Sequence, residues 1–169
     1  FQPAVLVENT QVCNDISILR FDRKINIQAG EFVFLWIPGL GEKPFSVLTD
    51  DPFSLAVIDV GKFTHALVNL AVGTKAYVRG PYGIPVDPPE DAQIIAVAGG
   101  TGLAALYQVA RDFDNVEIFV GARSAERLYF LDQCRQVASV HVATDDGSEG
   151  FGGFVSEMLQ EHLQQLSQD

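Results

Sequence analysis

A glycine-rich turn at residues 99–102 is the clearest candidate for chemistry in the sequence. It follows an apolar run at residues 94–98 and precedes an apolar segment of good helix formers, which predicts a buried strand, a tight turn and a helix start. Glycines let a phosphate approach the backbone closely, and free N–H groups at a helix start attract its charge. Because the spacing is Gly-Gly-x-Gly and not the full fingerprint, a turn needed only for packing is the alternative. The candidate dinucleotide ligands are Gly99, Gly100, Thr101 and Gly102.

A second candidate site presents a cation, a rigid kink, an aromatic ring and a hydroxyl in four consecutive residues, Lys43, Pro44, Phe45 and Ser46. Lys43 can hold an anionic phosphate, Phe45 can pack against a flat heterocycle, and Ser46 can be directed at a ring heteroatom. The alternative is the start of a strand that places Phe45 in the core.

The third candidate site is the segment Gly61, Lys62, Phe63 and Thr64. Its glycine, its hydroxyl and the amides of a helix start can form a phosphate nest, to which Lys62 adds charge. A plain helix N-terminus capped by Thr64 explains the same residues equally well. Three such nests in one chain favour more than one phosphate-bearing ligand.

Short apolar segments separated by turn residues fill the first half of the chain. They predict the strands of a small antiparallel barrel or sandwich, with one helix at residues 64–70. The predicted strands are residues 5–7, 16–21, 32–37, 54–60 and 75–78.

Four prolines between residues 81 and 89 then indicate an irregular connection and a domain boundary near residues 88–92. Strands and helices alternate beyond it, which predicts a doubly wound parallel sheet with ligands at the carboxyl ends of its strands. We therefore expect a first domain at residues 1–90 and an α/β domain at residues 91–169, which lacks a last strand at its C-terminal end. The predicted strands are 94–98, 116–120 and 140–143, and the predicted helices are 103–113, 127–136 and 155–166.

The composition excludes several classes of partner. A net charge of −11 argues against a surface that binds nucleic acid or anionic lipid. No apolar run reaches the roughly 20 residues of a membrane span and no signal peptide opens the chain, so we expect a cytoplasmic protein. Cys13 and Cys134 lie far apart, which supports neither a disulfide framework nor a metal site.

The four motifs that begin at Lys43, Gly61, Gly80 and Gly99 occur in an order and at separations that resemble the ferredoxin–NADP reductase superfamily. Within it, residues 36–46, 144–148 and 152–155 resemble the electron-transfer subunits of dihydroorotate dehydrogenase. The resemblance covers nearly the whole chain. It implies an FAD-binding barrel followed by a nicotinamide-dinucleotide domain.

The resemblance also implies a role for each motif residue. Lys43, Pro44, Phe45 and Ser46 would contact the flavin and its phosphates, with Ser46 as the catalytic residue nearest the reactive edge of the ring. The FAD pyrophosphate would be held at residues 58–64, and Gly99 to Gly102 would bind NAD(H), with Arg123 and Asp145 at its far end. The cofactor-binding residues expected at the FAD pyrophosphate are Ile58, Val60, Gly61, Lys62 and Thr64.

The sequence departs from the superfamily pattern at several points. Lys43 stands where an arginine is common, so the charge is kept but bidentate phosphate binding is lost. Phe63 stands where a small residue is common and could tilt the pyrophosphate or shield the ring. The family carries a four-cysteine 2Fe–2S site, and the two cysteines of this sequence cannot supply its ligands.

The function implied is transfer of electrons from NAD(H) through FAD to the catalytic dihydroorotate dehydrogenase subunit, in pyrimidine biosynthesis. Arg123, Ser124 and Arg127 could bind a 2′-phosphate, but the two arginines could equally be solvated surface charges, and the resemblance favours NADH. One alternative is a flavin reductase subunit of a hydrogenase or of a ferredoxin–NAD(P) oxidoreductase. Another is a non-catalytic nucleotide-binding module with a regulatory role.

Overall fold

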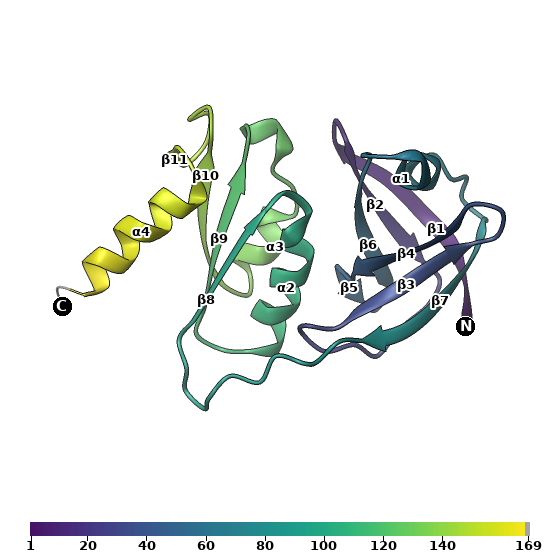
Figure 1. The fold of residues 1–169 in the computed structure, drawn as a ribbon, viewed down its shortest axis with the longest axis horizontal. Helices are drawn as coiled ribbons and strands as arrows, with labels where there is room; N and C mark the ends of the chain where they lie inside the picture. Colours follow the sequence, from purple (N-terminus) through teal and green to yellow (C-terminus); the bar gives the residue numbers. More distant parts are fainter. Residues whose placement is uncertain (168–169) are drawn as a thin grey trace.

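The computed structural model describes residues 1–167, which form two β-sheets joined by an irregular connection at residues 83–93 (Figure 1). The first sheet is antiparallel and the second is parallel. An antiparallel barrel-like half followed by an α/β half is the predicted fold class, which is confirmed. Within residues 1–167 no helix has the length and apolarity that a membrane crossing requires.

The first sheet has seven strands in the order β4-β3-β7-β1-β2-β6-β5. Successive side chains point to opposite faces of this sheet. In β3, Val33, Leu35 and Ile37 are therefore buried, while the residues between them are half-buried. The first half also contains one helix, α1 (Lys62–Val68), two residues earlier than predicted. The strands are β1 (Gln2–Cys13), β2 (Ile16–Phe21), β3 (Phe32–Ile37), β4 (Gly41–Ser46), β5 (Thr49–Asp50), β6 (Phe53–Ile58) and β7 (Lys75–Tyr82).

The second sheet has four strands in the order β11-β10-β9-β8, all parallel. Figure 1 shows α2 and α3 on the face of this sheet that looks toward the first half, and α4 on the opposite face. The elements are β8 (Ile94–Gly99), the 3₁₀ turn η1 (Gly100–Gly102), α2 (Leu103–Asp112), β9 (Val116–Ala122), the 3₁₀ turn η2 (Ala125–Arg127), α3 (Leu131–Arg135), β10 (Ser139–Thr144), β11 (Phe151–Gly152) and α4 (Val155–Leu166).

The predicted helix at residues 127–136 is wrong in its first half. Leu128 has extended backbone angles, Tyr129 is buried, and Phe130 has a left-handed φ of +60° before α3 begins. These three residues pack into the core as an irregular segment, and this packing outweighs their helical spacing. The structure also adds β4 and the two-residue strands β5 and β11, and it extends β1 and β7 well beyond the predicted ranges.

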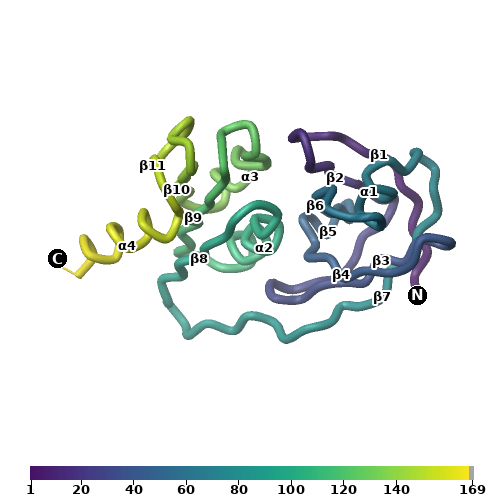
Figure 2. The backbone as a smooth tube through the Cα atoms, turned by 45° about the horizontal axis from the view of Figure 1, so that its top comes forward, coloured from purple at the N-terminus to yellow at the C-terminus, as the bar shows by residue number. Residues whose placement is uncertain are grey.

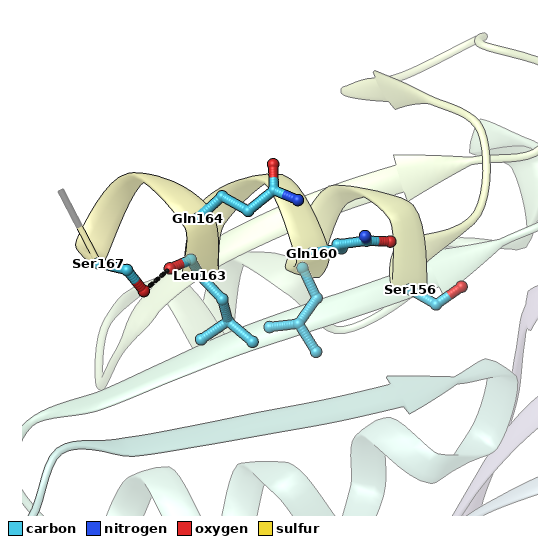
Figure 3. A pocket seen from close by; sticks show the side chains of 6 residues that line it. Ser156, Gln160, Leu163, Gln164 and Ser167 are labelled. Carbon is cyan, nitrogen blue, oxygen red and sulfur yellow. Dashed lines mark hydrogen bonds between the residues drawn. The ribbon is translucent and has the colours of Figure 1, made fainter.

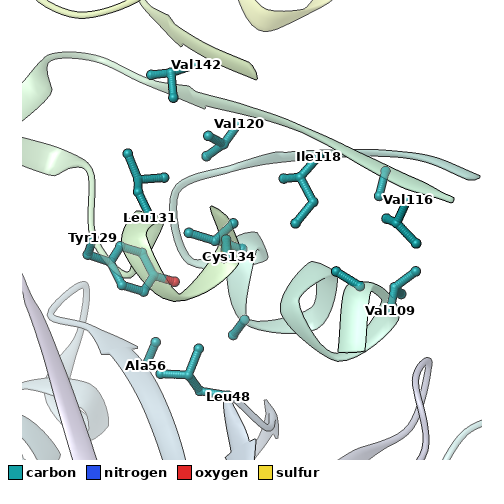
Figure 4. Packing of buried hydrophobic residues seen from close by; sticks show 14 of the residues in the cluster. Leu48, Ala56, Val109, Val116, Ile118, Val120, Tyr129, Leu131, Cys134 and Val142 are labelled. Carbon is teal, nitrogen blue, oxygen red and sulfur yellow. The ribbon is translucent and has the colours of Figure 1, made fainter. Parts of the chain in front are cut away.

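One hydrophobic cluster joins the two halves. Leu48 and Ala56 of the first half pack against the same cluster as Tyr129 and Cys134 of the second (Figure 4). Two polar contacts cross the same boundary: Arg111 pairs with Asp50 at 2.6 Å, and the backbone N–H of Ala29 donates to Asp112 at 3.0 Å. The connection at residues 83–93 runs alongside both halves (Figure 2). The relative position of the two halves is therefore fixed by packed side chains and not by this connection alone.

Gly150, in the turn between β10 and β11, has a φ of +67°, and a Cβ added there would lie 2.1 Å from the carbonyl oxygen of Val142. We expect Gly150→Ala to lower the free energy of unfolding by about 2 kcal/mol or more, because left-handed strain and overlap with the backbone add. Urea unfolding measures the loss. Gly39→Ala is the matched control, since Gly39 has a φ of +83° with open space around an added Cβ. Equal losses of unfolding free energy in the two variants would show that overlap with Val142 does not contribute to the destabilisation.

Candidate functional site

The strand β4 carries the predicted motif at residues 43–46, at one edge of the antiparallel sheet. Phe45 is half-buried against the core, while Lys43, Pro44 and Ser46 are exposed. Register places Phe45 opposite Val33 and Ser46 opposite Phe32 on β3. The alternative of a strand with Phe45 at the core is thus partly correct, and the exposed cation and hydroxyl stay free for a ligand.

The predicted motif at residues 61–64 forms the start of α1. Gly61 is extended, and the Thr64 hydroxyl accepts hydrogen bonds from the backbone N–H groups of Val60 at 3.1 Å and Gly61 at 3.0 Å. The N–H groups that precede the first intrahelical bond, His65 N to Gly61 O at 2.7 Å, belong to residues 62–64. Thr64 therefore caps its own helix, and Lys62 and the first-turn amides are the groups available to an anion.

The fold brings the two motifs together. The ring centroids of Phe45 and Phe63 lie 6.4 Å apart, with an angle of 31° between the ring planes. This aromatic pair brings β4 close to the start of α1. Of the four lysines, only Lys24 forms an ion pair within residues 1–167, so Lys43 and Lys62 keep unpaired charges. Two exposed cations beside aromatic rings fit a ligand that combines phosphates with a flat ring, as FAD does.

A cavity of about 460 Å³ lies against this strand. It combines the Ser46 end of β4 with aromatic residues of β3 and with Ala105 of α2. Ala105 comes from the second half of the chain, so the cavity spans both halves. Its lining residues are Gly30, Glu31, Phe32, Phe34, Pro44, Phe45, Ser46 and Ala105.

A second cavity, of about 450 Å³, lies at the glycine turn. Gly100 has a left-handed φ of +55°, and a Cβ there would meet no atom within 4 Å, so this backbone faces open space. Gly102 serves packing instead, because its Cβ would lie 3.0 Å from that of Ala98. Four residues of the predicted dinucleotide site line this second cavity: Gly99, Gly100, Arg123 and Asp145. Ile58 and Val60, predicted at the FAD pyrophosphate, line the same cavity. Thr101 and Gly102 lie in the same turn but do not line it.

Two loops at the carboxyl ends of β9 and β10 form the far wall of this cavity. They are held together by bonds from Asp145 N to Ala122 O at 3.0 Å and from Ala125 N to the Ser148 hydroxyl at 2.8 Å. Hydrogen bonds from the Ser148 hydroxyl and N–H lower the pKa of Asp146, so this carboxylate is charged at neutral pH. The arrangement fixes Arg123 and Asp145, both exposed, at one edge of the sheet.

Residues that the sequence did not single out also line this cavity. Asp15, in the turn between β1 and β2, pairs with Arg127 across the two halves at 3.0 Å. Arg127 is therefore held in an ion pair that crosses the two halves. Asp15 carries no local signal in the sequence, since an Asn-Asp pair in a hairpin is ordinary turn chemistry. The other lining residues outside the predicted ligand set are Ile16, Gly121, Ala122, Phe154 and Val155; of these, Gly121 and Ala122 belong to a loop predicted at the ligand-binding edge of the sheet.

A larger cavity of about 550 Å³ runs along one face of α4 (Figure 3). All of its lining residues belong to that helix or its C-cap, and none is ionisable: Ser156, Leu159, Gln160, Leu163, Gln164 and Ser167. A groove formed by one helix without converging charged groups offers no chemistry, so we assign function to the two smaller cavities.

Both cysteines are buried as free thiols, one in each half. Burial raises the pKa of Cys13 and raises that of Cys134 to about 11, so neither is a thiolate at neutral pH. Residues 1–167 contain no group of three or more His, Cys, Asp or Glu side chains that could hold a metal ion. These residues therefore do not fit a 2Fe–2S cluster.

Curated relatives match the chain over most of its length. It is 37% identical over 167 residues to the probable dihydroorotate dehydrogenase B (NAD(+)), electron transfer subunit, of Pyrococcus abyssi, covering 97% of this chain and 66% of the relative. The proteins of the same name from Methanocaldococcus jannaschii and Thermococcus kodakarensis are 40% and 34% identical, and the matches cover 85% and 99% of this chain. These matches cover 56% and 72% of the two relatives. The search of family models gave no match to this sequence.

Solved structures share the fold. The NADH-dependent reduced ferredoxin-NADP oxidoreductase superposes with a TM-score of 0.84 at 24% identity, covering 95% of this chain and 63% of that one. The cytochrome b5 reductase domain of Ulva prolifera nitrate reductase superposes with a TM-score of 0.72 at 20% identity, covering 90% and 78%. These likenesses establish the two-part fold of a ferredoxin reductase.

The share of each relative's length that the chain covers decides whether family membership is shown. The chain spans 56% to 66% of the length of the first two relatives, and 72% of the Thermococcus kodakarensis protein at 34% identity. Sequence identity, the order of the motifs and the fold agree over this length. The chain belongs to the family of dihydroorotate dehydrogenase B electron transfer subunits.

Proposed function

We propose that the chain binds FAD and NAD(H) and passes electrons from NAD(H) toward a catalytic dihydroorotate dehydrogenase subunit. The observation that carries the proposal is that two cavities each border the first residues of α2 or the turn just before it. Ala105 contributes to the cavity at Ser46, and Gly100, in the turn just before α2, contributes to the cavity at the glycine loop. Two sites that share one helix start can bring two flat rings together.

Each group of residues has a part in this proposal. Lys43, Lys62 and the first-turn amides of α1 bind phosphates of FAD, and the Phe45 and Phe63 rings exclude water beside it. The Ser46 hydroxyl is exposed at the end of β4, where it orients the reacting edge of the ring. When bound, FAD accepts a hydride from NADH and gives up electrons one at a time to an acceptor.

The second half of the chain supplies the dinucleotide site in the same proposal. The open backbone at Gly99 and Gly100 accepts the pyrophosphate, while Arg123 and Asp145 contact the adenosine end. Residues 1–90 then form the FAD-binding domain and residues 91–169 the NAD(H)-binding domain. The partner is the catalytic subunit, as the names of the relatives indicate for those proteins.

An anaerobic absorption spectrum tests the proposal. Protein reconstituted with FAD and freed of excess cofactor is expected to retain flavin bands, and these are expected to bleach when NADH is added. A protein that retains no flavin would overturn the assignment of residues 43–64. Bound flavin that stays oxidised with NADH would overturn the reductase function and favour a regulatory nucleotide-binding module.

A further inference from the structure

The pairing of Asp15 with Arg127 has a consequence for which dinucleotide the second cavity accepts. In doubly wound sheets, an acidic residue near the end of the second strand binds the ribose hydroxyls of NAD, whereas an arginine there accepts the 2′-phosphate of NADP. This chain carries Arg123 and Arg127 just after β9, and by that rule it should prefer NADP(H).

One of these two arginines, Arg127, is already paired with a carboxylate of the protein. The Arg127 Nη2 atom lies 3.0 Å from Asp15 Oδ2, and the side chains are only 36% and 23% exposed. Solvent partly screens an ion pair with this exposure, yet a phosphate that displaced Asp15 would leave a carboxylate uncompensated beside Arg127. Arg127 is therefore held by the first half of the chain.

The other groups around this ion pair also disfavour the binding of a 2′-phosphate. Ala125 N, a backbone donor in the same loop, is already taken by the Ser148 hydroxyl at 2.8 Å. Arg123 forms no ion pair among the described residues, yet the Asp145 carboxylate lines the same cavity. A 2′-phosphate brings a charge of about −1.5 to −2, so it would meet one free cation and two carboxylates.

Asp15 also retains an unused acceptor. Its Oδ1 atom is buried and has no hydrogen-bond donor within residues 1–167. A buried acceptor without a donor is unfavourable, and a phosphate placed beside it would add further negative charge. The Asp15 carboxylate thus disfavours a 2′-phosphate.

We infer that Asp15 is the specificity-determining residue of the dinucleotide site: it withholds Arg127 from a 2′-phosphate and selects NAD(H) over NADP(H). This inference rests on the proposed function, because it assumes that the second cavity binds a dinucleotide. The residue acts from the half of the chain that does not contain the glycine loop.

Calorimetric titration with 5′-ADP and with 2′,5′-ADP tests it without flavin. The unaltered chain is expected to bind 5′-ADP more tightly. In Asp15→Asn the ratio of the two dissociation constants is expected to move about tenfold toward 2′,5′-ADP, since Arg127 gains a charged partner in the ligand. The double variant Asp15→Asn/Arg127→Gln is expected to lose that gain.

Asp51→Asn is the matched control. It removes the same charge from an exposed pair with Lys24 that does not line the cavity, and it is expected to leave the ratio unchanged. Arg127→Gln alone provides a second variant should Asp15→Asn fail to fold, and it is expected to leave the preference for 5′-ADP in place. A tenfold loss of 2′,5′-ADP affinity in Arg127→Gln would show that Arg127 is already a phosphate ligand and would overturn the inference.

The two proposals fail in different ways. If both nucleotides bind the unaltered chain but Asp15→Asn leaves their ratio unchanged, the specificity inference is wrong and the dinucleotide site stands. If neither nucleotide binds, the proposed function fails and the inference fails with it.

Discussion

Replacing both Lys43 and Lys62 by glutamate is expected to weaken FAD binding about a thousandfold, because each charge-assisted hydrogen bond contributes about 1.5–3 kcal/mol. Both lysines are exposed, and neither forms an ion pair among the residues that the structure describes. Their charge therefore balances no protein carboxylate and can act on a bound phosphate. The net charge of −11 makes these local cations more important, since the overall field opposes an anionic ligand.

The effect is measured by fluorescence titration of flavin-free protein with FAD. Lys24→Glu/Lys75→Glu is the matched control: it makes the same change in net charge with two exposed lysines outside β4 and α1. We expect the control to weaken FAD binding severalfold at most, and less in high salt. Equal weakening by the two double variants would show that residues 43–64 do not form the phosphate site.

Gly100→Val is expected to raise the NADH concentration needed to reduce the flavin by about a hundredfold or more, with no loss of bound flavin. The backbone at Gly100 faces the open space of the second cavity, so a branched side chain there would occupy the space of the ligand. The φ of +55° also disfavours valine, and a shift of the turn would move Gly99 as well.

Anaerobic reduction at increasing NADH concentrations measures this effect, and flavin content is recorded on the same sample. Gly73→Val controls for backbone strain, because Gly73 has a φ of +92° and open space around an added Cβ but lies in the turn before β7. We expect the control to lose stability while it keeps its response to NADH. Loss of flavin in Gly100→Val would place the flavin, and not the nicotinamide dinucleotide, at the glycine loop.

Regular periodicity made part of the fold predictable. The bounds of β2, β3 and α4 match the predicted ranges 16–21, 32–37 and 155–166, because each shows a clear alternation or helical spacing of apolar residues. The strand β4 was harder to predict. Its sequence, Gly-Glu-Lys-Pro-Phe-Ser, is largely polar, since it lies at a sheet edge with only Phe45 turned toward the core.

Contacts between the two halves explain what the sequence did not reveal. Residues 128–130 have helical spacing, but Tyr129 is buried against the first half, and no local pattern contains that information. The same limit applies to the site. The glycine turn and the lysines are visible as local motifs, whereas Asp15 joins the second cavity only because the fold brings it to Arg127.

The hydrophobic cluster shared by the two halves couples their folding. Ile16, Ala29, Leu48 and Ala56 are buried against residues of the second half, so a polypeptide ending near residue 90 would expose this apolar patch to water. Such a fragment would lose the area-dependent stabilisation of that interface and gain a surface prone to association. We therefore expect the two halves to unfold as one cooperative unit, and exchange of either half for another domain would require the surface between them to be rebuilt.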